Sequence, residues 1–397
     1  MLIVHLAWCD LIRDRFFLFC NIAVMVGILV PLLVLFGVKN GVYSALIGEM
    51  LADPANLQID TAGNASFTPD DLAPLRDWPE IAFMTPKVRG QFDYVNTRAK
   101  DGRRMRPALL IPSGAGDPSL PAGVSLDPGV AVSAQLAAQL DLSVGTELQM
   151  ITQAEDRPRQ LLISAPVVAV LPESGTPGRA VLAPFATLDL IEAFYDSYSL
   201  PDHGIIGSRD LDQRVTAYEG VRVYARSLQE LAGLQARIEQ QLGISTNART
   251  RDVNALLGLG HKLNLALGLT AGLAALGLGA ALVLGFWSDV VRKKTVLAGI
   301  ALLGVPGRSL ALFPMVQALI TAGLGLILSF ALFGVAGRVA AALFGQGMPG
   351  GAALAVISVG QAAAICGGVL VLVLGAAAAA AWSAQRLDPA TVLREAM

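Results

Sequence analysis

Four long stretches without a charged residue set the first constraint on how this chain can fold. They cover residues 16–38, 263–287, 310–337 and 339–385. About 20 apolar residues in a helix cross a bilayer core that is about 30 Å thick. The first three stretches therefore predict one spanning helix each. The fourth is too long for one span, and its glycine and proline cluster at Gly345–Gly351 predicts a loop before a last helix over 353–384.

Charged residues are concentrated between the first two stretches. Residues 39–262 hold 26 of the 31 acidic and 20 of the 29 basic residues. Strand-like and helix-like segments alternate over 53–250, which predicts an α+β domain. The expected fold class is a membrane protein with four transmembrane α-helices and a large α+β domain inserted between helices 1 and 2. The net charge of −2 argues against a nucleic-acid partner, because phosphates require a basic surface.

Short basic segments predict the orientation, because lysine and arginine in short loops stay in the cytoplasm. The amino-terminal arm, the loop between the second and third spans, and the carboxy-terminal tail are all basic. Their basic residues are Arg13, Arg15, Arg292, Lys293, Lys294, Arg308, Arg386 and Arg394. In a four-span arrangement these segments share one side. Both termini are therefore expected in the cytoplasm and the inserted domain outside it.

Local patterns predict several elements of the inserted domain. Thr68 and Pro69 begin a helix over 68–75, and aliphatic residues at helical spacing predict another over 228–242. Strands are expected at 56–59, 130–133, 148–152, 161–171 (interrupted at Pro166) and 221–225, with a helix at 134–140. The basic run Lys100–Arg106 predicts a solvated hairpin around Asp101-Gly102, with an anion site as the alternative.

Helical patterns also extend beyond two of the spans. The second span continues from Asp252 to Ser288, which is roughly 55 Å of helix, and the first continues through 42–50. Two such helices would form a stalk. Residues 6–15 mix apolar and charged residues, as in an interfacial helix. The expected segments are an interfacial helix (1–15), helix 1 and stalk (16–52), the domain (53–250), stalk and helix 2 (251–287), a cytoplasmic loop (288–309), helix 3 (310–337), an outer loop (338–352), helix 4 (353–384) and a cytoplasmic tail (385–397).

Small residues in the second span predict close helix packing. Gly268 and Gly272 have GxxxG spacing, and Ala275 and Gly279 continue the series. The partner is either another helix of the same chain or a second copy. The first reading is favoured, since four helices must first pack on each other.

Motifs of catalysis or nucleotide binding are missing from the sequence. It has no HExxH, GxSxG, SxxK or CxxC motif, and His203 and His261 are isolated. No GxxxxGK[ST] loop occurs, so any ATP must be bound by another chain. A membrane-bound enzyme is therefore the weakest of the functional hypotheses, and no cofactor or metal site is expected in this chain.

The order of these segments resembles the FtsX/MacB/LolC-type ABC transporter permeases over nearly the whole chain. AWCDLIRDRFFLFCNIAVMVGILV resembles the interfacial helix and first span of that family, and GVAVSAQLAAQLDLSVGTELQM resembles a strand and helix of its outer domain, followed by a strand pair such as QLLISAPVVAVL. RLDPATVLREAM resembles its closing amphipathic helix. The stretch VRKKTVLAGIALLGVPGRSLALF resembles the coupling helix that contacts the ATPase.

The loop between spans two and three is the site that this resemblance implies. Its residues are Arg292, Lys293, Lys294, Val296, Leu297, Ile300, Leu303, Gly304 and Pro306. An exposed apolar helix needs a partner, which is either the ATPase or the lipid headgroups. The chain departs from the family pattern in having Val296 and Ala301 in place of a glutamate and an arginine, and Gln317 in place of a glutamate.

The resemblance implies a permease subunit in the bacterial cell inner membrane. It would pair with a second copy or a paralogue and with two cytoplasmic ABC ATPase chains that hold ATP and Mg. By mechanotransmission it would drive export or extraction of a lipophilic or lipoprotein-like substrate, with a possible periplasmic partner. The alternative is a non-transporting regulator of an extracytoplasmic partner such as a cell-wall hydrolase.

Overall fold

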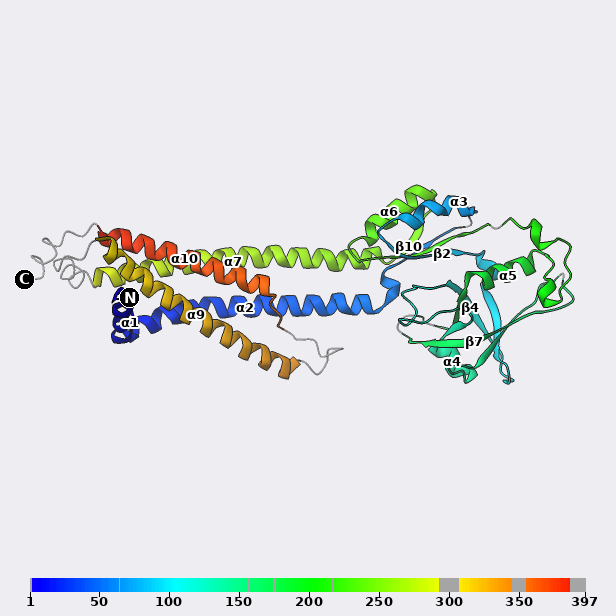
Figure 1. Ribbon diagram of the computed structural model, residues 1–397, viewed down its shortest axis with the longest axis horizontal. Helices are drawn as coiled ribbons and strands as arrows, with labels where there is room; N and C mark the ends of the chain where they lie inside the picture. The colour runs from blue at the N-terminus through cyan, green and yellow to red at the C-terminus, as the bar shows by residue number, and fades with distance from the viewer. Residues whose placement is uncertain are drawn as a thin grey trace, which may run out of the picture. The chain divides into compact units, whose positions relative to one another are not determined.

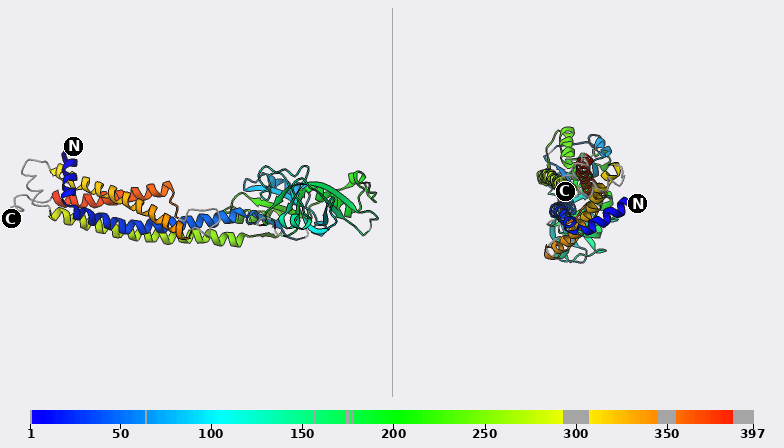
Figure 2. Two further views of the ribbon diagram at one scale, coloured as in Figure 1. Left: turned by 90° about the horizontal axis from the view of Figure 1, so that it is seen from below. Right: turned by 90° about the vertical axis from the view of Figure 1, so that its left-hand side faces the viewer.

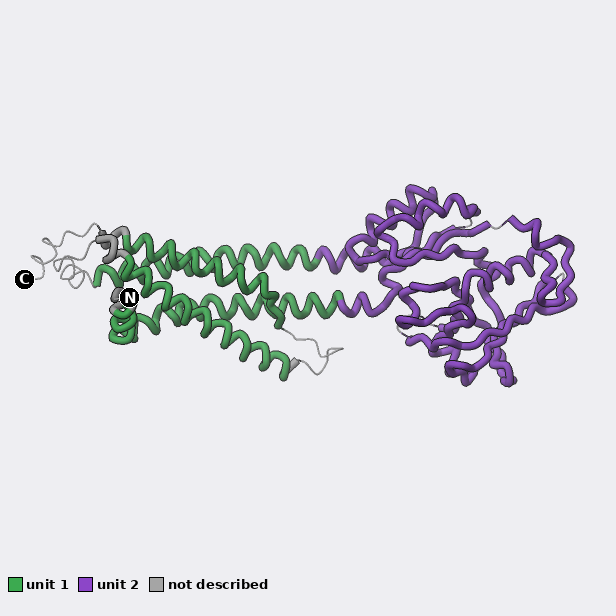
Figure 3. The backbone as a smooth tube through the Cα atoms, viewed as in Figure 1, with its two compact units in different colours: residues 1–47, 259–397 green, residues 48–258 purple. Residues whose placement is uncertain are grey.

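Two compact units make up the chain. The computed structural model describes residues 2–63, 65–155, 157–173, 176, 178–215, 217–292, 307–344 and 355–385. One unit comprises residues 1–47 and 259–397, and the other comprises residues 48–258 (Figure 3). The first is helical, and the second is the inserted domain.

The described residues include four helices that are long and apolar enough to cross a membrane, which confirms the predicted number of spans. They are α2 (Arg15–Ala52), α7 (Thr250–Arg292), α9 (Gly307–Phe344) and α10 (Val359–Gln385). The chain is therefore a multi-pass membrane protein. At 1.5 Å per residue, α2 and α7 are roughly 57 and 65 Å long, about twice the thickness of a bilayer core.

The four helices, labelled in Figure 1, share one apolar core of buried side chains. Met25 of α2, Phe286 of α7, Ala322 of α9 and Val373 of α10 are all buried in it. Glycine allows the closest approaches: a Cβ on Gly325 would lie 3.0 Å from the Sδ of Met25. Small residues play this part in lipid, where helices are held together mainly by close packing. A further helix, α1 (Leu2–Arg13), runs across the direction of the long helices (Figures 1 and 2) and packs on α9.

Helix α10 begins at Val359, later than the expected residue 353. Ser358 and Gln361 bond reciprocally there: the Ser358 backbone N donates to the Gln361 side chain, and the Gln361 N donates to Ser358 Oγ, both at 3.2 Å. This capping box satisfies free backbone donors of the first turn and so sets the start of the helix. Helix α9 also runs past the expected end at 337, continuing through Arg338 to Phe344.

The inserted domain contains an antiparallel sheet and a closed barrel, which confirms the α+β prediction. The sheet has the order β10-β1-β9-β2, and the barrel has the order β3-β4-β8-β5-β7-β6. The sheet strands are β1 (Gln58–Thr61), β2 (Ile81–Lys87), β9 (Gly220–Ala225) and β10 (Thr246–Ala248). The barrel strands are β3 (Tyr94–Ala99), β4 (Arg106–Ser113), β5 (Val130–Ser133), β6 (Glu147–Thr152), β7 (Leu161–Leu171) and β8 (Ala180–Pro184).

Among its described residues, four α-helices lie entirely within this unit. They are α3 (Pro69–Leu72), α4 (Ala134–Leu140), α5 (Phe185–Tyr195) and α6 (Leu231–Leu242). The buried side chains of α4 and α5, such as Leu136 and Phe194, belong to the barrel core. Helix α3 is shorter than predicted, because the chain continues as a 3-10 helix over Ala73–Asp77.

Strand β7 is continuous through Pro166, where an interruption was predicted. Proline lacks a backbone donor, so within sheets it is tolerated at edges and bulges. The pairing of β7 with β5 shifts directly after Val167, where Val130 pairs with Val167 but Ala131 pairs with Ala169. This irregularity accommodates the proline without ending the strand.

The basic run 100–106 forms the turn between β3 and β4, as predicted. Thr97 pairs with Arg106 across the antiparallel ladder, and the Gly102 N donates to the Ala99 carbonyl at 2.9 Å. Lys100 and Arg104 are exposed and pair with Glu147 and Asp141. The run is thus a solvated hairpin end with carboxylate partners for two of its bases.

Candidate functional site

Of the loop residues predicted to contact an ATPase, the structure describes only Arg292. Arg292 is the last residue of α7. The other predicted contact residues lie outside the described residues: Lys293, Lys294, Val296, Leu297, Ile300, Leu303, Gly304 and Pro306. The described flanks of the loop are therefore Arg292 and the first turns of α9, which begins at Gly307.

A polar cluster surrounds Arg292. Its Nη2 donates to Asp14, which lies between α1 and α2, and to Asp289 one turn earlier on α7 at 3.0 Å. The guanidinium also lies over the ring of Phe17, 5.0 Å from the ring centroid. Asp289 is buried, whereas the Arg292 side chain is half exposed. The cluster joins the end of α7 to the start of α2.

A second contact joins α1 to the other flank of the loop. Gln317 of α9 is buried, and its Nε2 donates to Asp10 of α1 at 2.8 Å. Ala7 and Leu11 are buried on the same face of α1 as Asp10, as expected for residues three or four positions apart. Trp8 and Ile12 on the other face are exposed. This two-faced character fits the predicted interfacial helix.

Another polar cluster lies near residue 40 of the same unit. Lys39 of α2 donates to Asn264 of α7 at 2.5 Å. Asn40 donates to Gln361 of α10 at 2.7 Å and to the Val356 carbonyl at 3.3 Å. Side-chain hydrogen bonds thereby join α2 to α7 and to α10, close to the ends of the uncharged stretches of α2 and α7. The polar residues of this cluster come from three distant segments, so the cluster was not predicted.

The predicted small-residue face of α7 is largely open. Gly268 and Gly272 are exposed, and no atom lies within 4 Å of a Cβ placed on either glycine. Ala275 and Gly279 are partly buried, and a Cβ on Gly279 would lie 3.6 Å from Leu372 of α10. Within the described residues, the first two glycines therefore face away from the chain and the last faces α10.

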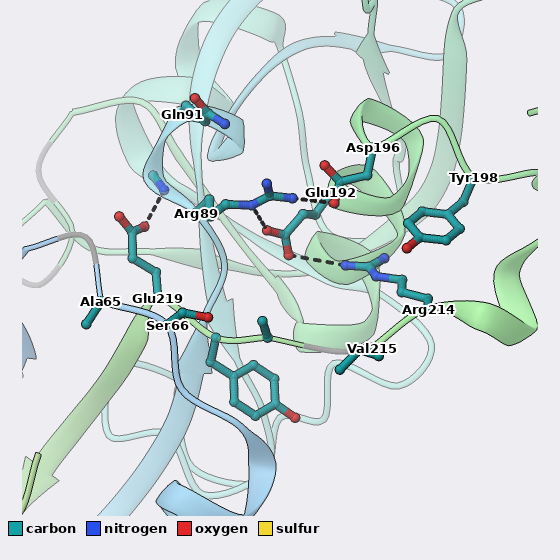
Figure 4. Close-up of a pocket in the computed structure, with 13 residues that line it drawn as sticks. Ala65, Ser66, Arg89, Gln91, Glu192, Asp196, Tyr198, Arg214, Val215 and Glu219 are labelled. Atoms are coloured by element: carbon teal, nitrogen blue, oxygen red, sulfur yellow. Dashed lines mark hydrogen bonds and ion pairs between the residues drawn. The ribbon is translucent and has the colours of Figure 1, made fainter. Parts of the chain in front are cut away.

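A polar cleft of about 570 Å³ opens on the inserted domain (Figure 4). Its walls come from the segment after β2, from the end of α5 and from the residues before β9. Glu192 of α5 lies at its centre and is 3% exposed. Arg89 and Arg214 reach this carboxylate from opposite sides (Figure 4), the second at 3.2 Å.

The remaining charges of the cleft are paired as well. Arg89 also contacts Asp196, and Arg214 lies 2.8 Å from Asp189. Partial burial alone would lower the pKa of Arg89, but its bonds to Glu192 and Asp196 outweigh this effect and raise the pKa. Burial raises the pKa of Asp189 despite the nearby Arg214.

Carboxylates outnumber arginines among the residues that line the cleft. With Glu219, which accepts a bond from the Gly90 N at 2.5 Å, three carboxylates and two arginines line the cleft. The surplus of negative charge favours a cationic or hydrogen-bond-donating ligand. The described lining residues include no histidine or cysteine. No group of three or more potential metal ligands is arranged to hold an ion anywhere in the described part of the chain.

Sequence reasoning did not identify this cleft. Arg89, Glu192 and Arg214 come from distant segments and share no motif. A scan against protein-family profiles gives no match, and a search of curated proteins gives none either.

Proposed function

We propose that this chain is the permease subunit of an ABC transporter of the FtsX/MacB/LolC type. It would transmit ATP-driven motion from the cytoplasm to the inserted domain on the other side of the membrane. The observation that carries the proposal is the continuity of α2 and α7. These helices flank the inserted domain in the sequence. Helix α2 is continuous over 38 residues and α7 over 43 residues.

Helix continuity matters because a helix transmits displacement where a flexible linker absorbs it. A Gly/Ser-rich linker behaves as a random coil, whereas every residue of α7 from Thr250 to Arg292 is helical. A movement imposed at Arg292 would therefore be passed along the helix toward residue 250. The packing of α2, α7, α9 and α10 around one core supports movement of the bundle as a body.

The basic segments support an orientation with both termini in the cytoplasm of a bacterial cell. In this arrangement the loop of residues 293–306 faces a cytoplasmic ATPase, which would hold ATP and Mg. Two ATPase copies and a second permease, identical or paralogous, would complete the complex. The substrate class that fits the resemblance is a lipophilic or lipoprotein-like molecule.

The polar cleft favours a second candidate function. Its carboxylates and arginines suit a polar ligand or a protein surface better than a lipid. In this reading the inserted domain activates an extracytoplasmic partner, such as a cell-wall hydrolase, without moving a substrate. Substrate movement in reconstituted vesicles would separate the two candidates.

The proposed function is tested by purifying the full chain from its native membranes in mild detergent. An ABC ATPase subunit, identified by its phosphate-binding GxxxxGK[ST] sequence, should copurify and hydrolyse ATP. Leu303→Asp should abolish the stimulated activity while leaving membrane insertion intact. Leu211→Asp, at an exposed leucine of the inserted domain, is the control and should retain it. If no ATPase copurifies with the wild-type chain, the proposal is wrong.

A further inference from the structure

Helix α1 contacts both described flanks of the proposed coupling loop. Helix α7 ends at Arg292, directly before residues 293–306, and α9 begins at Gly307, directly after them. Asp14, at the end of α1, accepts a bond from Arg292. Asp10, within α1, accepts a bond from Gln317 on α9. One short amino-terminal segment thus contacts both helices that flank residues 293–306 in the sequence.

The apolar contacts of α1 place these carboxylates. Ala7 is fully buried and Leu11 is nearly so, and α1 packs on α9. Asp10 lies three residues after Ala7, and Asp14 lies seven residues after Ala7, so the three residues share one helical face. The backbone N of Asp14 still bonds to the Asp10 carbonyl at 2.8 Å, which keeps Asp14 in this register. Movement of α1 across α9 would therefore displace the carboxylate that holds Arg292.

Close packing also fixes the start of α2 against α7. Asn21 is buried, and a Cβ on Gly285 would lie 2.8 Å from its Oδ1. Gly285 is two turns before Arg292 on α7. The Arg292–Asp14 contact is therefore made between segments that already lie close together. Asp14 itself is bonded to both helices, since its backbone N donates to Asp10 and its carbonyl accepts from the N of Phe17 and of Leu18.

The identity of Gln317 fits this arrangement. Its amide donates to the carboxylate of Asp10. A glutamate at this position would place a second carboxylate beside Asp10, and the two charges would repel at neutral pH. The glutamine amide thus supplies a donor to Asp10 that an ionised glutamate would lack.

We propose that α1 is a positioning element for the coupling loop, acting through Asp14 on Arg292 and through Asp10 on Gln317. It holds the end of α7 and the beginning of α9 in a fixed relation, so that the loop is presented to the ATPase in one arrangement. This inference rests on the proposed function. It adds that ATP turnover depends on residues of α1 that lie outside the loop.

The test measures α1 docking and ATP turnover separately in the complex purified with its ATPase. Asp14→Lys should speed hydrogen exchange of residues 2–13 by about fivefold, the factor expected for loss of one partly exposed ion pair. It should lower kcat for ATP hydrolysis and leave KM for ATP unchanged, because in the proposed complex the ATPase chain binds the nucleotide. The conservative variant Asp14→Glu keeps a carboxylate for Arg292 and should leave both readouts close to those of the wild type.

A second variant keeps the test valid if Asp14→Lys does not fold. Gln317→Glu, on α9 and outside the loop, should also speed exchange of residues 2–13 and lower kcat. Arg338→Gln is the control, since Arg338 is an exposed arginine of α9 with no ion pair among the described residues. It should change neither readout.

Each other outcome counts against the proposal in a recognisable way. Faster exchange with normal turnover would show that α1 docking does not govern the ATPase. Unchanged exchange in both variants would show that these contacts do not hold α1. Either result leaves the transporter assignment standing. If no ATPase copurifies with the wild-type chain, both the transporter assignment and the positioning role of α1 are wrong.

Discussion

Arg222 and Asp117 form a buried ion pair, with Nη1 3.2 Å from Oδ2, that joins the central strand β9 of the sheet to the segment following β4 of the barrel. The Asp117 side chain is 0% exposed and the Arg222 side chain 6%. Ser113 Oγ donates to the same carboxylate at 2.6 Å, and Arg222 also donates to the Pro112 carbonyl at 3.0 Å. The sheet and the barrel of the inserted domain are thus linked by a buried ion pair and by hydrogen bonds.

Removal of the arginine should be costly, because Asp117 would be left charged and buried. Arg222→Ala is expected to lower the free energy of unfolding by about 3–5 kcal/mol. The measurement is thermal or denaturant unfolding of the full chain in detergent. Arg104→Ala breaks an exposed pair with Asp141 and serves as the control, with an expected change of about 0–1 kcal/mol. Equal effects of the two substitutions would contradict the assigned role of the buried pair.

Gly220 should not tolerate a methyl group. A Cβ at this position would lie 1.7 Å from Thr61 Oγ1, and that hydroxyl is held by the Val221 N at 2.9 Å. Gly220→Ala is expected to destabilise the domain by about 1–3 kcal/mol, as overpacking does. Gly233→Ala in α6 is the matched control, since nothing lies within 4 Å there and alanine is the better helix former. Unfolding midpoints of both variants give the comparison.

Two glycines of α2 allow a similar comparison within the membrane. A Cβ on Gly37 would lie 2.7 Å from the ring of Phe333 on α9, whereas one on Gly27 meets nothing within 4 Å. Gly37→Val should therefore lower the unfolding temperature of the solubilised chain, at a cost of about 1–3 kcal/mol. Gly27→Val should have a smaller effect. The opposite order would mean that α2 and α9 do not pack in this register.

Glu239 gives the inserted domain a predictable response to acid. Hydrogen bonds from the side chain and then the backbone N of Thr246, at 2.8 and 2.9 Å, lower its pKa in the folded state. A carboxylate whose pKa is lower in the folded state stabilises that state at pH values above the unfolded-state pKa of about 4.3. This stabilisation is lost as the pH falls through the lower, folded-state pKa.

The variant Glu239→Gln should accordingly lose less stability than the wild type on acidification from about pH 5 to pH 3. Melting temperatures across this range provide the measurement. Glu173→Gln, at an exposed glutamate of the same domain, is the control and should follow the wild type. Parallel curves for wild type and Glu239→Gln would exclude the Thr246 contact as a source of acid sensitivity.

Elements with strong local signals were predictable from sequence. Helix α4 was predicted with its observed bounds because Ser133 caps its first turn and Asp141 ends it in the left-handed conformation, with φ 55°. Helix α10 begins later than its hydrophobic stretch alone predicts, because the capping box of Ser358 and Gln361 sets its first turn. The four spans followed from uninterrupted hydrophobicity, which dominates other signals over such lengths.

Features that depend on distant pairing were not predictable. Strand β8 pairs in parallel with β4, about 70 residues earlier in the chain, and no local pattern indicates that partner. The same holds for Glu192, whose arginines lie 103 and 22 residues away. The carboxylates at positions 10, 14 and 289 could have drawn attention, since charged residues beside an apolar span need a partner.

The strand order of the inserted domain limits how another protein could bind to it. The barrel has no open edge, since β3 pairs with β6 to close it. In the sheet, edge strand β10 has only three residues, and edge strand β2 carries Pro86 and an irregular register near Ile81. Short or proline-containing edges resist addition of a foreign strand. A cargo or partner would therefore be recognised through side chains and not through backbone augmentation, and binding would depend on sequence more than on extended shape.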